Sequence, residues 1–242
     1  MKNLEKLYFD DSLSIIVPLY NKQENIENTL FLIHKYIQAK KIEILIIENG
    51  STDLSLERAR LAKEQLEGKV DIQIYNSQKG LGNALRKGFE VAKNNWVYFV
   101  PADFSFGNSD ISYIVNNNLY SKFDLFIGSK GHTESQITRQ ISRKIYSKLL
   151  NFFINKQFKI KILDTQGSLF FKSKILKILP TLQSQEFTIT AEIIILSIKN
   201  GIKIKEVPII DYQINSKSTV SPVKDGYRMI YQLNKLKSKL TT

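Results

Sequence analysis

Runs of consecutive apolar, often β-branched residues alternate with segments of helical periodicity through the first half of the chain. The apolar runs predict strands near residues 12–18, 41–48, 70–76, 95–101 and 123–128. Segments with one apolar face predict helices near 23–38, 53–67, 81–94 and 109–119. The strand segments are apolar on both faces, as central parallel strands are, and strands and helices alternate as in βαβ units. The pattern predicts an α/β fold with a mostly parallel central sheet flanked by helices.

The alternation changes after residue 130. A long basic helix near 137–156 is followed by a strand near 167–172, helices near 172–179 and 187–200, and a last strand, KIKEVPII. A polar loop (212–223) and a basic C-terminal helix complete the chain. Because no repeat or Gly/Ser-rich linker separates these parts, we expect one domain over residues 1–242. Its expected parts are 12–130, 131–212 and a basic C-terminal helical extension, 213–242.

Composition narrows the class of protein. The chain of 242 residues contains no cysteine, which excludes disulfides and thiolate metal sites and suits a reducing compartment. The first ten residues lack the apolar stretch of a signal peptide, and the longest apolar run, AEIIILSI, is shorter than a membrane span. The net charge of +12 indicates an anionic partner, which is a nucleic acid, a phosphorylated substrate or an anionic membrane.

The basic residues gather in the second half of the chain. Seven Lys/Arg and no acid lie between Arg139 and Lys161, and six lie from Lys217 onward against one acid, Asp225. No aromatic–basic recognition module appears, so we expect no nucleic-acid partner. In the basic helix an apolar stripe stands beside four cations: Ile141, Ile145, Leu149 and Phe153 with Arg139, Arg143, Lys144 and Lys148. This pattern is typical of a helix in a membrane interface, or of a helix packed on the sheet with a solvated basic face.

Polar and glycine residues follow the first four predicted strands. The segments are VPLYN (17–21), IENGSTD (47–53), KGLGNALRKG (79–88) and PAD (101–103). In an open α/β sheet, ligands bind outside the carboxyl ends of the strands, and the third segment is a basic helix entry that suits phosphate. It also resembles a dinucleotide fingerprint, but Leu85 occupies the third glycine position and the segment follows the third strand. Together the four loops predict a binding site at one edge of the sheet.

Over roughly residues 12–212 the chain resembles the family 2 glycosyltransferases of the nucleotide-diphospho-sugar (GT-A) fold. Within that family it most resembles polyprenyl-phosphate glycosyltransferases such as the dolichyl-phosphate mannose and glucose synthases. The matching stretches are IIVPLYNKQENI, ILIIENGSTDLS, KGLGNALRKGFEVAK, YFVPADFSF, DLFIGSK, SRKIYSKLLNFFIN, DTQGSLFFKSKIL and GIKIKEVPI. The resemblance implies transfer of a sugar from a UDP- or GDP-sugar to a polyprenyl-phosphate carrier. The enzyme would be cytoplasmic and peripheral on the anionic cytoplasmic face of the membrane.

The resemblance also implies roles for individual residues. Those on the donor side are Pro18, Tyr20, Asn21, Glu48, Asn49, Lys79, Gly80, Asn83 and Ala102. Asp103 matches the last acid of the Asp-x-Asp motif, which implies a catalytic ligand for Mg²⁺ or Mn²⁺. Asp164 and Gln166 match the family's DTQ segment beside the sugar and the acceptor and are the other catalytic candidates. Further substrate-binding residues expected from the matching and basic segments are Lys130, Arg139, Arg143 and Lys217.

Pro101 departs from the family pattern, because it stands where the motif has its first acid. We expect Asp103, diphosphate oxygens and water to hold the metal more weakly as a result. A phosphate acceptor is already ionised at neutral pH and needs no general base. A glycan hydroxyl acceptor would need one, and Glu186 and Glu192 are the candidates. The sequence is also compatible with nucleotidyl transfer, and with a weakly active or inactive homologue that binds a membrane or partner.

Overall fold

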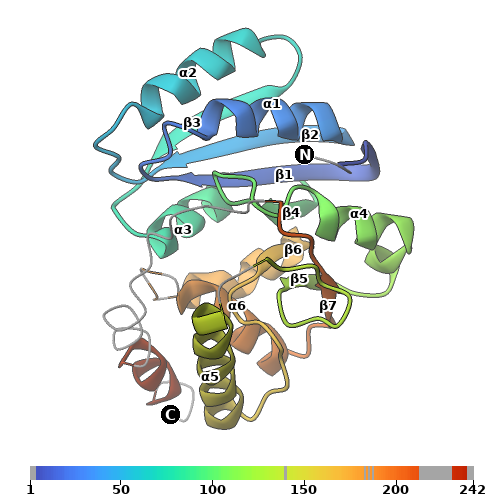
Figure 1. Ribbon diagram of the computed structural model, residues 1–242, viewed down its shortest axis with the longest axis vertical. Coiled ribbons are helices and arrows are strands. Elements are labelled where there is room, and N and C mark those ends of the chain that lie inside the picture. Colours follow the sequence, from blue (N-terminus) through green and yellow to red (C-terminus); the bar gives the residue numbers. More distant parts are fainter. Residues whose placement is uncertain are drawn as a thin grey trace.

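A computed structural model describes residues 4–138, 141–182, 184, 186, 188–212 and 231–238, with the backbone alone for residues 141–146 and 178–181. Within these ranges seven strands form one sheet in the order β3-β2-β1-β4-β6-β5-β7 (Figure 1). The strands are β1 (Leu7–Leu19), β2 (Ile37–Glu48), β3 (Asp71–Asn76), β4 (Trp96–Phe99), β5 (Leu125–Ser129), β6 (Ser168–Lys172) and β7 (Ile204–Pro208). Only β6 is antiparallel to its neighbours, β4 and β5. The predicted mostly parallel sheet is confirmed.

Helices cover both faces of the sheet. They are α1 (Ile26–Tyr36), α2 (Ser55–Gln65), α3 (Leu81–Val91), α4 (Ser109–Asn116), α5 (Ile141–Phe158) and α6 (Thr188–Lys199). Two short 3₁₀ segments, η1 (Leu119–Ser121) and η2 (Ser173–Thr181), complete the described elements. The sequence predicts a helix near 172–179, and the structure has the 3₁₀ segment η2 there.

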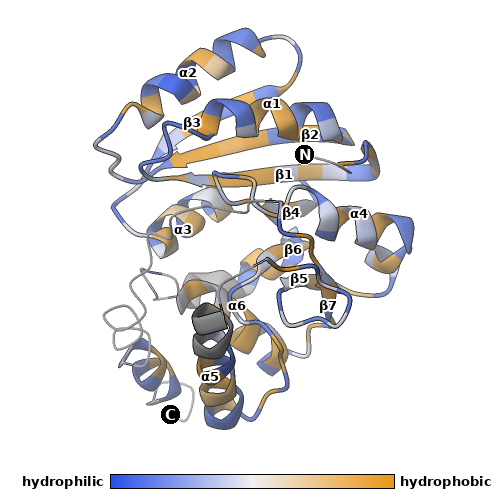
Figure 2. Ribbon diagram, viewed as in Figure 1, coloured by the Kyte–Doolittle hydropathy of each residue, from blue (hydrophilic) through white to orange (hydrophobic). Residues whose placement is uncertain are grey.

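Side chains along the central strands alternate between two cores, as the period of two in a β-strand requires. In β2, Ile44 and Ile46 pack in the core beneath α1, α2 and α4. Leu45 and Ile47 pack on the opposite face with α3, α5 and α6. Burial on both faces makes these strands hydrophobic along most of their length (Figure 2). The helices therefore bury both faces of the sheet.

The first strand is longer than the sequence pattern predicts, because it begins at Leu7 and contains two acidic residues before Ser12. A register shift against β2 lies between Phe9 and Ser12. Phe9 is buried and packs edge-on against Trp96, with ring centroids 5.7 Å apart. The additional pairing between β1 and β2 therefore lies at the amino ends of these strands, opposite the loops that follow them. Phe9 completes the core at that end.

The C-terminal residues 231–238 are helical and pack against the lower part of the molecule beside α5 (Figure 1). Leu233 and Leu236 are buried in the core that contains α5 and α6. The Gln157 side-chain amide donates to Asn234 Oδ1 at 2.8 Å, which joins this helix to α5. Residues 213–230, including most of the predicted polar loop, lie outside the described residues. Among the helices described, none has the length and hydropathy needed to cross a bilayer.

Candidate functional site

The sheet topology brings the predicted loops to one edge. β1, β2, β3 and β4 run parallel, so their carboxyl ends share that edge. β6 is antiparallel to both β4 and β5, so the start of β6 lies beside the ends of those two strands. The segment before β6 contains Asp164 and Gln166, and Lys130 follows the last residue of β5. The acceptor-side candidates therefore lie along the same edge as the donor-side loops.

Hydrogen bonds join the loops after β1 and β2 into one unit. Asn21 adopts a left-handed backbone conformation with φ of 48°, which asparagine tolerates better than most residues. Its Oδ1 accepts the Thr52 N–H at 2.8 Å, and its own N–H donates to Ser51 Oγ at 3.1 Å. Glu48 Oε1 accepts the Ser51 N–H. Asn21, a donor-side candidate, thus binds the loop after β2, within which Glu48 is held by the Ser51 N–H.

The next residues of the first loop are bound to the start of α2. The Lys22 N–H donates to Ser55 Oγ at 2.6 Å, and the Gln23 N–H donates to Asp53 Oδ2 at 3.2 Å. Burial acts to raise the pKa of Asp53, but hydrogen bonds from Ser55 and the Gln23 N–H outweigh it and leave the pKa below its ordinary value. The Asp53 carboxylate therefore stays ionised and holds the loop at neutral pH.

Two donor-side candidates from different loops meet directly. The ammonium of Lys79 lies over the ring of Tyr20, 4.7 Å from its centroid, a cation–π arrangement. Gly80 follows with φ of 119° and precedes the first turn of α3. Asn83 donates to the Lys79 carbonyl at 2.8 Å and accepts from Arg86. The helix entry is basic, and its first N–H groups suit phosphate.

Asp103 follows β4 and points across the edge toward the loop after β1. Its Oδ2 lies 3.1 Å from the ammonium of Lys22, and its Oδ1 accepts the Ser105 N–H at 3.3 Å. The Pro101 carbonyl accepts the Phe104 N–H at 2.9 Å, which turns the chain back after the strand. Ala102 is buried, and its carbonyl accepts the hydroxyl of Thr29 at 2.9 Å. The turn is thus anchored on α1, and Asp103 projects from it.

Lys130 and Asp164 form a buried ion pair on the acceptor side, with 2.5 Å between the ammonium and Oδ2. The same ammonium donates to the Gln166 carbonyl at 3.0 Å, and the Gln166 N–H donates to Asp164 Oδ1 at 3.0 Å. Burial acts to raise the pKa of Asp164, but the charge and hydrogen bonds of Lys130 leave the pKa below its ordinary value. Lys130 also lies over the ring of Phe106 at 5.7 Å, which joins this cluster to the loop of Asp103.

Two residues that the sequence pattern did not single out hold the acceptor-side loop. Asn151 on α5 accepts both the N–H and the hydroxyl of Thr165, at 3.0 and 2.8 Å. Glu206 on β7 accepts the N–H of Asp164 at 3.0 Å and that of Leu163 at 2.9 Å. Both contacts depend on chain segments that are distant in sequence, so no local feature identifies them.

The remaining predicted site residues make none of the side-chain contacts described above or lie outside the described side chains. Pro18 lies within β1 opposite Ile47, and Asn49 is buried while its N–H donates to the Leu19 carbonyl at 3.0 Å. Arg139 and Lys217 lie outside the described residues, and the side chain of Arg143 is not described either. The roles of all these residues stay predictions.

Glu192, a candidate base for a hydroxyl acceptor, lies on α6. Its side chain is 1% exposed, and Oε2 accepts the Ser184 N–H at 2.8 Å. A general base must reach the proton that it removes. The position of Glu192 inside the core therefore favours a structural role over proton abstraction.

The strand-end carboxylate fits a divalent cation. Among the described residues no group of three or more His, Cys, Asp and Glu could hold a metal. Mg²⁺, however, is often bound by one or two carboxylates together with substrate phosphates and water. Asp103 already presents one oxygen to a cation, the ammonium of Lys22. The donor set therefore fits Mg²⁺ or Mn²⁺ held by Asp103 together with oxygens of a phosphorylated substrate.

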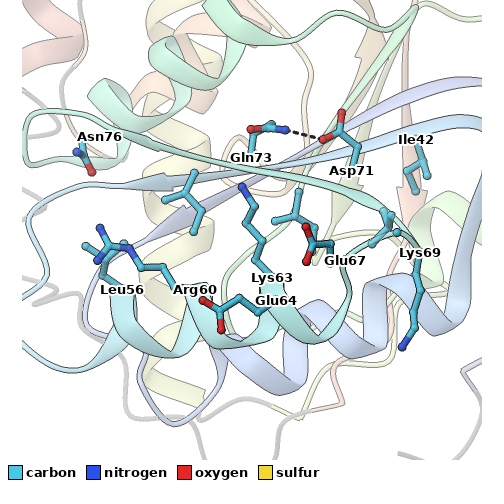
Figure 3. A pocket seen from close by; sticks show the side chains of 14 residues that line it. Ile42, Leu56, Arg60, Lys63, Glu64, Glu67, Lys69, Asp71, Gln73 and Asn76 are labelled. Atoms are coloured by element: carbon cyan, nitrogen blue, oxygen red, sulfur yellow. Dashed lines mark hydrogen bonds between the residues drawn. The ribbon is translucent and has the colours of Figure 1, made fainter.

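A groove of about 1000 Å³ lies elsewhere, between α2 and the edge strand β3 (Figure 3). Its charged lining residues are Arg60, Lys63 and Lys69 with Glu64, Glu67 and Asp71. None of the predicted site residues lines this groove. Cations and acids are equal in number there, so the groove offers no net positive charge to a diphosphate.

The sequence is similar to that of several known proteins. Residues 14–178 match glycosyl transferase family 2. The chain is 28% identical to the dolichyl-phosphate beta-glucosyltransferase of Saccharomyces cerevisiae, over 93% of this chain and 71% of that protein. It is also 28% identical to an uncharacterized protein of Methanocaldococcus jannaschii, over 92% of this chain and 91% of that protein.

Solved structures resemble the fold. Glucosyl-3-phosphoglycerate synthase from Mycobacterium tuberculosis in complex with UDP aligns with a TM-score of 0.68 and 13% identity, over 94% of this chain and 80% of that one. Its complex with Mn²⁺, UDP and glucosyl-3-phosphoglycerate aligns with a TM-score of 0.64 and 13% identity, over 92% and 77% of the two chains. At this level of identity the likeness shows the fold, which is the GT-A glycosyltransferase fold.

Proposed function

Because this chain belongs to glycosyl transferase family 2, we propose that it transfers a sugar from a nucleotide diphosphate to a polyprenyl phosphate at a membrane surface. The observation that carries this proposal is the placement of Lys22, Lys79 and Lys130 with Asp103 along one sheet edge. Two negatively charged substrates must meet there, and the edge supplies cations to both. The similarity to the yeast dolichyl-phosphate beta-glucosyltransferase supports a lipid phosphate as the acceptor.

The donor would occupy the part of the edge formed by residues 12–130. Tyr20, with Lys79 over its ring, offers an aromatic and cationic surface for the nucleotide. Gly80 and the first turn of α3 provide N–H groups and close backbone approach for the diphosphate. Glu48, held by the Ser51 N–H, is placed to accept a ring N–H of the base. UDP- and GDP-sugars are both compatible with these groups.

Asp103 would hold Mg²⁺ or Mn²⁺ through the oxygen that now contacts Lys22. When bound, the ion stabilises the negative charge that develops on the leaving diphosphate. Pro101 supplies no carboxylate at the position before Ala102, so we expect a weaker metal site than two carboxylates would make. Solved relatives by fold contain Mn²⁺ or Mg²⁺ with UDP, which supports the choice of ion.

The acceptor would approach from residues 131–212. An oxygen of its phosphate attacks the anomeric carbon, the bond from that carbon to the donor diphosphate breaks, and the nucleoside diphosphate leaves. A phosphate monoester is mostly dianionic at neutral pH, so no base is required. Lys130, oriented by Asp164 and Gln166, is our candidate for the cation that pairs with the phosphate.

Exposed apolar side chains beside the acceptor loop favour a lipid carrier. Leu149 and Phe152 on α5 are 63% and 67% exposed, and Leu163, directly before Asp164, is 54% exposed. The Asn151 amide donates to the Leu163 carbonyl at 2.9 Å, so helix and loop form one surface. Exposed lysines are interspersed: Lys148, Lys156 and Lys161. Apolar side chains among cations suit an anionic membrane surface, to which Arg139, Arg143 and Lys217 would add charge.

The test is direct transfer. The purified protein is incubated with labelled UDP- or GDP-sugars, Mn²⁺ and anionic vesicles that contain polyprenyl phosphate. We expect label in a lipid fraction that is stable to phosphatase but released by mild acid, as expected of a sugar–phosphate–lipid. Vesicles with the corresponding polyprenol are the control and should give no product. Transfer to polyprenol, or to a soluble glycan alone, would contradict the phosphate acceptor.

A further inference from the structure

Lys22 extends from one loop of the site to the carboxylate of another. Its ammonium lies 3.1 Å from Asp103 Oδ2, and the two side chains are 23% and 15% exposed. The residues are 81 positions apart in the sequence. A pair this sheltered from water is screened less by salt than a pair on an open surface. Because its ammonium contacts Asp103 Oδ2, Lys22 occupies a carboxylate oxygen that a divalent cation would need.

The backbone beneath Lys22 is fixed independently of this ion pair. The Lys22 N–H is bound by Ser55 Oγ, and the neighbouring Asn21 and Gln23 are bound by Thr52 and Asp53. Lysine carries a charged group on a flexible four-carbon stem with three donors. The ammonium can therefore change partners by rotation of the side chain while the loop stays in place.

Asp103 is the only carboxylate in the segment PAD, because Pro101 and Ala102 precede it. Two cations, the Lys22 ammonium and a divalent ion, compete for it. A nucleotide diphosphate at the same edge brings several anionic oxygens, and Lys22 can pair with one of them when a metal takes its place. The donor therefore ends the competition between Lys22 and the metal for Asp103, because it offers Lys22 another anionic partner.

We propose that Lys22 is a donor-binding residue that pairs with Asp103 when the site is empty and with the donor diphosphate when donor and divalent ion are bound. The inference rests on the proposed donor site and assigns Lys22 a specific role in it. Its consequence is a positive coupling between nucleotide and metal, because the metal releases Lys22 for the nucleotide and the nucleotide provides Lys22 with a new partner.

The experiment measures binding, not turnover. Mn²⁺ affinity without nucleotide is measured by electron paramagnetic resonance, and UDP and GDP affinity at saturating Mn²⁺ by calorimetry. The variant Lys22→Met should bind Mn²⁺ about fivefold more tightly and the nucleoside diphosphate about fivefold more weakly, the effect of one partly exposed ion pair. Lys22→Arg keeps the charge and should stay near the wild type. Lys40→Met, exposed near the opposite end of β2, controls for the change in net charge.

The possible outcomes separate this inference from the proposed function. If Lys22→Met binds Mn²⁺ no more tightly than the wild type, the competition for Asp103 is wrong. If it binds nucleotide at saturating Mn²⁺ as well as the wild type and Lys40→Met do, Lys22 does not contact the diphosphate. If the wild type binds neither UDP nor GDP under any condition, the proposed donor site fails, and the phosphate role of Lys22 fails with it.

Discussion

Lys130 binds the carboxylate of Asp164 twice, through its backbone N–H at 2.9 Å and through its ammonium at 2.5 Å. The end of β5 is thereby joined to the loop that enters β6, although the two partners are 34 positions apart in the sequence. Because the Lys130 ammonium also contacts the Gln166 carbonyl, this side chain holds the acceptor-side loop together with Asn151 and Glu206.

The ion pair between Lys130 and Asp164 makes the free energy of unfolding depend on pH under acidic conditions. The pKa of Asp164 is lowered on folding, so the pair contributes its full stability above the ordinary aspartate pKa and loses it as pH falls through the lowered value. Asp164→Asn leaves the Lys130 ammonium without its charge partner and should cost about 3 kcal/mol at pH 7. Denaturant unfolding at pH 7, and from about pH 4 downward, measures both effects.

A matched control is the exposed pair between Lys87 and Glu90 on α3, with 3.2 Å between the charged atoms. Glu90→Gln should change the free energy of unfolding by no more than about 0.5 kcal/mol. Equal losses of unfolding free energy in Asp164→Asn and Glu90→Gln would show that the buried pair stabilises the protein no more than an exposed pair does.

Replacement of Asp103 should separate nucleotide binding from metal binding. In Asp103→Asn the amide cannot supply a charged ligand, so the thermal stabilisation by UDP or GDP should no longer depend on Mn²⁺. Asp10→Asn, exposed near the start of β1, serves as the control and should keep the dependence. A metal-dependent shift in Asp103→Asn as large as in the wild type would remove Asp103 from the donor site.

Pro101→Asp should strengthen the same site. The residue lies just after β4, where its carbonyl and not an N–H makes the turn contact with Phe104, so the backbone tolerates another residue. One regained charge-assisted contact should tighten metal-dependent nucleotide binding by about 1–2 kcal/mol. Calorimetric titration with and without Mn²⁺ measures the gain. If affinity is unchanged while Asp103→Ala still binds metal and nucleotide normally, Asp103 only terminates a strand.

The exposed apolar residues of α5 should contribute to membrane binding. Leu149→Ser with Phe152→Ser should reduce sedimentation with anionic vesicles at low salt, because burial of these side chains in the interface is lost. Leu54→Ser with Leu61→Ser, which changes two comparably exposed leucines at the other end of the molecule, is the matched control. Equal sedimentation of both double variants would place the membrane surface elsewhere.

Gly167→Ala should deform the acceptor-side loop. A Cβ at this position would meet the carbonyl oxygen of Gly128 and lie 3.0 Å from its carbonyl carbon, where β5 pairs with β6. Such overpacking should cost about 1–3 kcal/mol of folding free energy and reduce transfer more than nucleotide binding. Thr133→Ala, at an exposed position, should leave both unchanged. Unaltered stability of Gly167→Ala would contradict the close approach of the strands.

The sequence pattern predicts the order of strands and helices along most of the chain but misses the start of β1. Asp10 and Asp11 interrupt the apolar run, and such residues are rare in strands. In the structure Asp11 accepts hydrogen bonds from the indole of Trp96 at 3.1 Å and from the amide of Asn95 at 2.9 Å. Its partners are 84 and 85 residues away, so only the folded sheet shows why an acid is tolerated there.

The same reason explains which site residues could be predicted. Loops at strand ends are visible locally, and the loops of Tyr20, Lys79 and Asp103 were predicted to share one edge, as the strand topology confirms. Lys22 and Glu206 were missed, because their importance comes from contacts with Asp103 and Asp164 across long stretches of chain. A charged residue in a loop has no distinctive pattern until its partner is known.

The register of the antiparallel strand β6 determines how the two substrate sites are aligned. The donor-side and acceptor-side strands are joined through four residue pairs between β4 and β6, from Trp96–Lys172 to Phe99–Leu169. A slip of two residues would preserve the inward and outward alternation yet move the Asp164 loop in the strand direction by about 7 Å, relative to the donor-side loops. Reacting atoms must approach to within about 3.5 Å. A change in the register between β4 and β6 would therefore misalign the two substrates, although neither substrate contacts the paired residues.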